Sequence, residues 1–148
     1  MKYSREGNLI ARGSTTQDSD PAIIKVYDGT YKKGFRVVKF QIAGQENNAN
    51  NDCAGKLTTA ELENGYGNVW NWDDPREIAW ASTNMFATGV REPVAEFIDN
   101  SKIVVRDLYV YVISNTATTF KVNYMVELEP VDLKEWEYSL SYVQNQQP

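Results

Sequence analysis

The stretch FKVNYMVELE, residues 120–129, decides the fold class of this 148-residue chain. Its apolar residues alternate with polar ones, so that five of them share one face and the polar side chains share the other. This alternation is typical of an antiparallel strand with one buried face and one face in water. The stretch therefore predicts an antiparallel β protein, and its buried face would consist of Phe120, Val122, Tyr124, Val126 and Leu128.

The strand-like stretches on either side are separated by short polar links. Residues 102–114 are rich in β-branched and aromatic side chains, and the polar link 114–118 predicts a hairpin with 120–129. Residues 22–27 and 35–42 predict a second hairpin, and in 35–42 the pattern places Val38, Phe40 and Ile42 on one face.

Two more strands are expected in the middle of the chain. Asn64 and Gly65 form the dipeptide that most favours a tight hairpin turn, which predicts strands at 56–63 and 66–72. A further short strand is expected at 76–81.

The end of the chain carries two competing patterns. Trp136, Tyr138, Leu140 and Tyr142 alternate like a strand, whereas Leu133, Trp136, Leu140 and Val143 follow helical spacing. Asp132 and Glu135 have the spacing of a capping box just after Pro130, which favours a helix. We therefore expect a short C-terminal helix, followed by a flexible tail at 144–148.

Length and composition fit one domain, since domains average about 150 residues. Hydrophobic residues make up 42% of the chain and charged residues 24%, which is close to ordinary globular usage. We expect residues 1–148 to form a single all-β domain, an antiparallel β-sandwich for which a jelly roll is one candidate topology. Within it, residues 1–20 would be a partly extended N-terminal arm and residues 44–55 a surface loop.

Several kinds of chemistry are excluded by composition. The chain has no histidine and a single cysteine, Cys53, which excludes imidazole bases, histidine metal sites, internal disulfides and multi-cysteine clusters. Asp73 and Asp74 lack the spacing of a calcium loop. A hydrolase built on either carboxylate would need a cleft and a raised carboxyl pKa. We expect no enzymatic activity, no cofactor and no metal.

The charge is unevenly distributed along the chain. The net charge is −5, but residues 1–40 hold eight basic and four acidic side chains, whereas residues 41–148 hold seven basic and sixteen acidic ones. Opposite balances of +4 and −9 favour contacts between copies, or a basic face turned toward an anion. Nonspecific contact with nucleic acid is a further option, through the basic residues Lys25, Lys32, Lys33, Arg36 and Lys39.

Three of the four tryptophans lie within residues 70–80, beside two carboxylates. Exposed indoles of Trp70 and Trp72, with Asp73 as a hydrogen-bond partner, would suit a carbohydrate-binding module. Alternatively, Trp70 and Trp72 would supply core on one face of a strand, and residues 73–75 would form the following turn. Both interpretations stay open at the level of sequence.

The C-terminal half resembles a known class of protein. Glu92-Pro93, the stretch IVVRDLYVYV at 103–112, the stretch VNYMVELE at 122–129 and the capped terminal helix resemble small β-sandwich virion proteins of phages and other microbial viruses. The resemblance implies a non-enzymatic capsid or capsid-associated subunit that self-assembles and resides in the virion after folding in the host cytoplasm.

The partners expected from this resemblance are further copies of the chain or other virion proteins, and no membrane span is expected, because no apolar run is long enough. Residues 1–4 carry no apolar run, so no signal peptide is expected either. The candidate subunit-contact or ligand surface comprises Tyr109, Tyr111, Trp70, Trp72 and Asp73.

Overall fold

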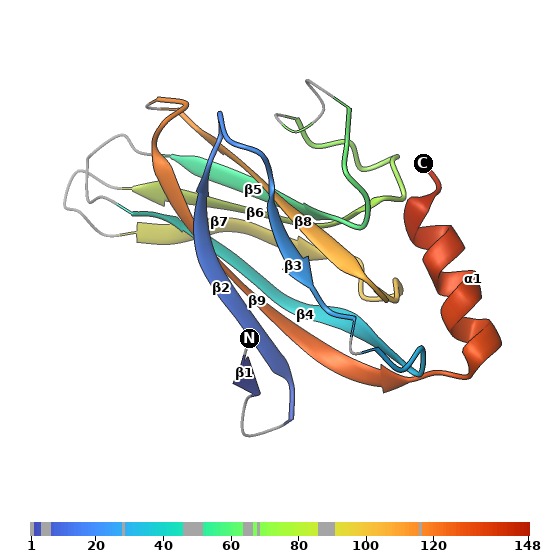
Figure 1. The fold of residues 1–148 in the computed structure, drawn as a ribbon. Helices are drawn as coiled ribbons and strands as arrows, with labels where there is room; N and C mark the ends of the chain where they lie inside the picture. The colour runs from blue at the N-terminus through green and yellow to red at the C-terminus, as the bar shows by residue number, and fades with distance from the viewer. Residues whose placement is uncertain are drawn as a thin grey trace.

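A computed structural model describes residues 2–3, 7–27, 29–45, 52–63, 67, 69–85, 91–115 and 117–148; for 2–3, 84–85 and 91–95 it describes the backbone alone. These residues form nine strands and one helix (Figure 1): β1 (Lys2–Tyr3), β2 (Leu9–Thr16), β3 (Ala22–Lys25), β4 (Lys33–Gly44), β5 (Cys53–Thr58), β6 (Glu77–Met85), β7 (Arg91–Ile98), β8 (Asp107–Ser114), β9 (Lys121–Asp132) and α1 (Glu135–Gln146).

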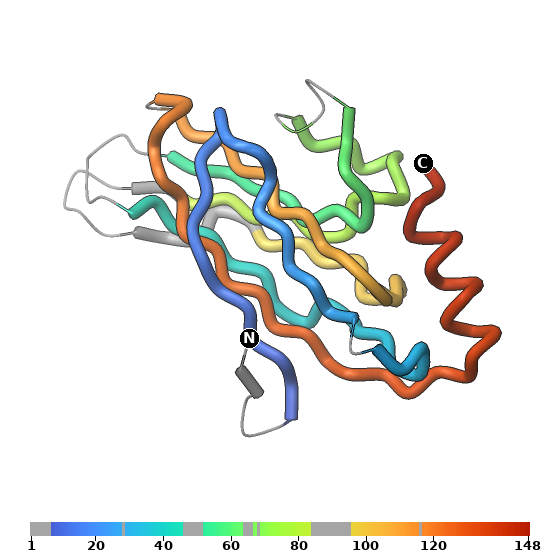
Figure 2. The backbone as a smooth tube through the Cα atoms, in the orientation of Figure 1, coloured from blue at the N-terminus to red at the C-terminus, as the bar shows by residue number. Residues whose placement is uncertain are grey.

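The strands form two antiparallel sheets packed face to face. Sheet A has the order β1-β2-β9-β4, and sheet B has the order β3-β8-β5-β6-β7. Figure 2 shows the trace passing back and forth between the two layers, with α1 set at one end of them. The predicted all-β sandwich with a C-terminal helix is confirmed.

Strand pairing is nested along the chain, as in a jelly roll. β5 pairs with β6, β3 with β8, and β2 with β9, so each pair encloses the one before it. β4 and β7 would be the remaining nested pair, but β7 forms its ladder with β6. β4 and β7 are linked instead by a side chain, because the backbone N–H of Phe40 donates to Oε1 of Glu96 at 3.1 Å.

The core lies between the sheets and follows the alternation seen in sequence. In β9 the side chains of Val122, Val126 and Leu128 are fully buried. They pack with the inward residues of sheet B, among them Leu57 and Val110, in one continuous apolar cluster. Burial of this cluster stabilises the sandwich, since each large aliphatic side chain contributes about 1.5–3 kcal/mol when removed from water.

Both hairpins predicted from short polar links are wrong. β8 and β9 lie in different sheets, and so do β3 and β4. The chain therefore passes from sheet B to sheet A between β3 and β4 and again between β8 and β9, instead of turning back within one sheet. Nested pairing requires these crossings, because β3 pairs with β8 and β9 pairs with β2, both far away in sequence.

The middle of the chain also departs from expectation. Residues 69–72, expected within a strand at 66–72, form bends and turns outside any strand. The predicted turn at 64–65 lies outside the described residues. β5 pairs instead with β6, which confirms the short strand expected near 76–81. Cys53 and Gly55, expected in a surface loop, are buried in β5.

Sheet A contains two further corrections. Residues 9–16, expected within an extended arm, form β2 and pair with β9 along their whole length. A bulge between Val37 and Lys39 shifts the register of β4. Val37 therefore shares the inner face with Phe40 and Ile42, and Val38 is exposed.

The helix begins later and ends later than its sequence pattern indicated. Asp132 is the last residue of β9, so Asp132 and Glu135 form no capping box; instead, the backbone N–H of Lys134 donates to Oε1 of Glu137 at 3.2 Å. Residues 144–146, expected in a flexible tail, continue α1, and Asn145 is buried.

Candidate functional site

All five predicted surface residues lie on the outer face of sheet B, which points away from sheet A, or on the segment that covers it. Inward positions of β5, such as Gly55, lie against Phe40 and Ile42 of sheet A. Lys56, the next residue, therefore points outward. The covering segments, residues 59–63 and 69–76, lie over this outer face and bring Trp70, Trp72 and Asp73 to it.

Trp72 forms the centre of an aromatic platform, which we define as Trp70, Trp72, Trp80 and Phe97. Trp72 is 64% exposed and Phe97 51%, whereas Trp80 is buried. The ring centroid of Trp72 lies 6.4 Å from Trp70 at an interplanar angle of 23°, 6.0 Å from Trp80 and 5.7 Å from Phe97. Trp72 thus presents an open indole face above a packed aromatic base, and a fully buried position for it is excluded.

A buried ion pair holds the platform on the sheet. Nζ of Lys56 lies 2.9 Å from Oε2 of Glu77, and both side chains are almost completely removed from solvent. Lys56 also donates to the carbonyl of Val69 at 2.6 Å. Oε1 of Glu77 accepts hydrogen bonds from the backbone N–H of Asn71 at 2.9 Å and from Nε1 of Trp80 at 3.0 Å. The residues on both sides of Trp70 are therefore fixed to the sheet through Lys56 and Glu77.

A second ion pair closes the turn after the platform. The guanidinium of Arg76 contacts both carboxylate oxygens of Asp74, the shortest distance being 2.8 Å. These side-chain hydrogen bonds hold the pKa of Asp74 below its usual range. Asp74 is thus an ionised structural group. Asp73, beside it, is exposed.

Tyr111 and Tyr109 lie on β8 in the same outer face, and both are half-buried. The hydroxyl of Tyr111 accepts the backbone N–H of Leu62 at 2.8 Å. Gly67 lies so close above Tyr111 that a β-carbon there would be 2.6 Å from the ring. Burial raises the pKa of both tyrosines. Tyr111 therefore anchors the covering segments.

The inner face of α1 closes one end of the sandwich. The side chain of Asn145 accepts the backbone N–H of Val105 at 3.3 Å and donates to the carbonyl of Ile103 at 2.8 Å. The hydroxyl of Tyr138 donates to the carbonyl of Val105 at 3.1 Å. The ring of Tyr138 also packs edge-on against Tyr31, with centroids 5.2 Å apart. One side of the helix is thus fully docked.

The other side of α1 carries an apolar stripe, defined as Trp136, Leu140 and Val143. These side chains are 64%, 51% and 51% exposed. Their helical spacing was the sequence signal for the helix, but such spacing normally marks the face that packs on the core. In α1, the face that packs on the rest of the protein carries Tyr138 and Asn145 instead. The stripe is therefore an exposed apolar surface on a helix whose other side is docked.

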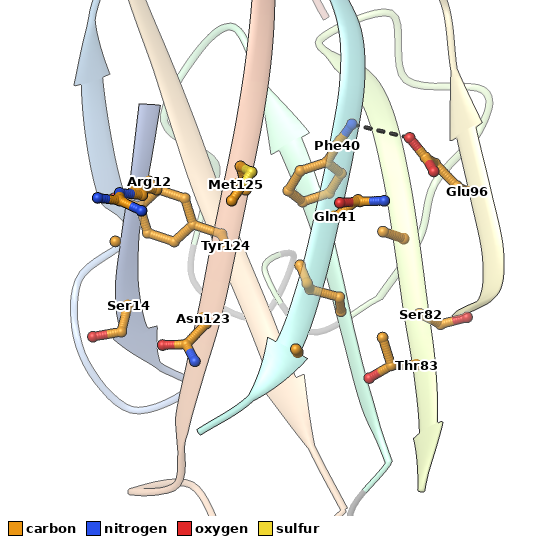
Figure 3. Close-up of a pocket in the computed structure, with 14 residues that line it drawn as sticks. Arg12, Ser14, Phe40, Gln41, Ser82, Thr83, Glu96, Asn123, Tyr124 and Met125 are labelled. Carbon is orange, nitrogen blue, oxygen red and sulfur yellow. Dashed lines mark hydrogen bonds between the residues drawn. The ribbon is translucent and has the colours of Figure 1, made fainter. Parts of the chain in front are cut away.

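A cavity of about 680 Å³ lies among five strands, β2, β9, β4, β6 and β7 (Figure 3). Its apolar lining includes Phe40, Tyr124 and Met125, and burial raises the pKa of Tyr124. Among the described lining residues the charged groups are Arg12 and Glu96, and Glu96 is engaged by the N–H of Phe40. This lining suits an apolar occupant better than acid–base chemistry.

Neither a metal site nor a likeness to a known protein assigns a reaction to these residues. Within the described ranges, no group of three or more acidic or cysteine side chains is arranged to hold a metal ion. No described helix combines the length and apolar character needed to span a membrane. No protein-family model, curated protein or solved structure matches the chain.

Proposed function

We propose that the chain is a structural, non-enzymatic subunit of a virion, a capsid or capsid-associated protein that self-assembles into a larger structure. The observation that carries the proposal is the apolar stripe on α1. Three large apolar side chains stay in water on a helix whose other side is already docked. Contiguous exposed apolar surface of this kind marks interaction sites.

The occupant we propose for the stripe is sheet A of a second copy. The outer face of sheet A exposes Met125 (40%) and Val38 (37%), which offer apolar surface. Arg12 stands directly opposite Met125 in the β2–β9 register. Helix α1 has no basic residue and carries Glu135 and Glu137 in its first turn. Apolar contact and opposite charge therefore favour the same pairing.

A contact between two different surfaces of one chain is heterologous, so it generates rings or extended arrays. The charge balances of residues 1–40 and 41–148 support this head-to-tail arrangement, because β2 lies in the basic part and α1 in the acidic part. Jelly rolls are frequent in capsid proteins and also occur in lectins, so the topology supports a virion role by analogy.

Light scattering coupled to size-exclusion chromatography tests the self-assembly. We expect masses above that of one 16.8 kDa chain, rising with concentration. Leu140→Lys should shift the protein to the monomer, because it places a charge in the stripe. Gln144→Lys is the matched control, since it adds the same charge to an exposed position on the same helix.

The virion role is tested separately, by electron microscopy of the concentrated protein and by mass spectrometry of purified virus particles. Regular shells, rings or lattices, or detection of the chain in particles, would support it. A strict monomer over a wide concentration range, together with absence from virus particles, would overturn the proposal.

A further inference from the structure

We propose that the aromatic platform on sheet B binds a neutral carbohydrate, with a sugar ring stacked on Trp72. This site is separate from the apolar stripe of α1. It would give the assembled protein a means of attaching to a glycan surface. The proposal rests on the geometry of the platform, the polar groups beside it and the sign of the charges around it.

The platform offers exposed aromatic surface on which a sugar ring can stack. Trp72 is 64% exposed, and Phe97, 51% exposed, meets it edge-on with ring centroids 5.7 Å apart. The faces of aromatic rings carry negative partial charge, so they attract the weakly positive C–H groups of a pyranose ring. Trp70 is half-buried and stacked nearly parallel to Trp72, so it supports the exposed indole.

The platform is held rigid before any ligand arrives. Lys56 holds the carbonyl of Val69, and Glu77 holds the backbone N–H of Asn71, so the chain is fixed just before Trp72. Trp80 packs against the indole of Trp72, and Nε1–H of Trp80 donates in turn to Glu77. A prearranged aromatic face avoids the entropy cost of ordering side chains on binding.

Polar groups flank Trp72 on both sides in sequence. Asp73 is exposed and offers carboxylate oxygens to sugar hydroxyls. Nδ2 of Asn71 is buried and has no hydrogen-bond partner among the residues that the structure describes. Unpaired buried donors are rare in folded proteins, because a donor removed from water without a new acceptor destabilises the fold. A rotation of this amide toward a bound hydroxyl would satisfy it.

The surrounding charge favours a neutral ligand over a nucleic acid. The exposed charged groups in the covering segments are acidic: Asp73, Glu61 and Glu63. The basic groups nearby, Lys56 and Arg76, are buried and engaged in ion pairs. Stacking on tryptophan also suits nucleic acid bases, but a phosphodiester chain requires a positive surface. A neutral sugar meets no such repulsion.

A fluorescence titration with a panel of neutral hexasaccharides of glucose, mannose and N-acetylglucosamine tests the proposal, with single-stranded oligothymidylate as the anionic comparison. We expect at least one hexasaccharide to quench tryptophan emission with saturation. Trp72→Ala should weaken that binding on the order of tenfold or more, as for a central binding residue. Trp72→Phe should keep part of the affinity, because it retains an aromatic face.

Trp136→Ala is the matched control, since Trp136 is equally exposed but lies in the apolar stripe of α1. It should leave sugar binding unchanged while weakening self-assembly, and Trp72→Ala should do the reverse. The two proposals therefore fail independently. The carbohydrate proposal is overturned if no hexasaccharide binds at millimolar concentration, if only oligothymidylate binds, or if Trp72→Ala changes the assembly state and leaves sugar binding intact.

Discussion

Lys56 and Glu77 form a buried ion pair in which Nζ of Lys56 lies 2.9 Å from Oε2 of Glu77. The remaining hydrogen bonds of the two side chains hold Val69, Asn71 and Trp80. A buried pair of this kind contributes little relative to apolar side chains of the same volume, but the loss of one partner leaves an isolated charge in the interior. Its role here is to position the covering segment.

Glu77→Gln should lower the free energy of unfolding by about 3–5 kcal/mol, because it leaves the Lys56 ammonium without its counter-charge. Urea denaturation followed by circular dichroism measures this. Glu63→Gln is the control, since Glu63 is 66% exposed and lies 3.6 Å from Arg76. Surface pairs are worth about 0–1 kcal/mol. Equal effects of the two substitutions would contradict the structural role assigned to Glu77.

Asp74 links the stability of the platform turn to pH. Its pKa is lowered by hydrogen bonds from Arg76, so its ionised form stabilises the folded protein above the ordinary carboxyl pKa of about 3.9. That contribution is lost as the pH falls through the lowered pKa. Asp74→Asn should therefore destabilise the protein at neutral pH, and the difference should shrink in acid.

Denaturation curves of the unaltered protein and of Asp74→Asn over a series of pH values check this prediction, with Asp73→Asn as the exposed neighbouring control. A gap in unfolding free energy that stays constant down to about pH 3, below the ordinary carboxyl pKa, would show that the Asp74–Arg76 pair is not the source of the difference.

At the scale of secondary structure, Asn145 is one of the side chains, with Tyr138, that hydrogen-bond α1 to the end of the sandwich. Asn145→Ala removes the groups that pair with the N–H of Val105 and the carbonyl of Ile103. Because Val105 is buried, we expect a loss of about 2–3 kcal/mol and faster amide hydrogen exchange throughout α1. Gln144→Ala, at an exposed neighbouring position, should stay within about 0.5 kcal/mol of the unaltered protein. Unchanged exchange in α1 would disprove this role for Asn145.

Individual strands could be recognised from sequence, but their partners could not. Alternation in 120–129 shows that one face is buried, and β9 has that face. Alternation carries no information on which sheet buries it, so the polar link 114–118 and the link between 22–27 and 35–42 resembled hairpin loops although the strands that they join lie in two sheets. The same limit applies to α1, whose period was visible although its docked face was not.

The candidate sites could be predicted only in part from the sequence, for a related reason. Three tryptophans within eleven residues marked the platform, but Phe97 joins it only through the β6–β7 register, in which it stands opposite Trp80. Whether Trp72 faces water depends on the buried pair between Lys56 and Glu77, and those residues lie far apart in sequence. Long-range contacts of this kind leave no local pattern.

At the scale of the whole molecule, the two proposed surfaces lie on different elements and differ in chemistry. The stripe on α1 is apolar and meets water along a helix, whereas the platform on sheet B combines aromatic faces with carboxylate and amide groups. Because neither surface uses the residues of the other, one subunit could assemble through α1 and still present Trp72 outward.

Head-to-tail assembly through α1 and sheet A should weaken as salt is added. Charges on the two surfaces attract over about 10 Å at 0.1 M ionic strength and over about 3 Å at 1 M. Raising sodium chloride from about 0.05 M to about 0.5 M should therefore increase the dissociation constant between copies severalfold, as measured by analytical ultracentrifugation.

Glu135→Gln should flatten this salt dependence, because it removes one of the two acidic groups in the first turn of α1, whereas Leu140→Lys should prevent assembly at every salt concentration. Contacts that are purely apolar would instead persist or tighten in salt. Assembly that strengthens with sodium chloride would thus exclude a charge contact with Arg12 on the outer face of sheet A, even if the stripe itself is buried between copies.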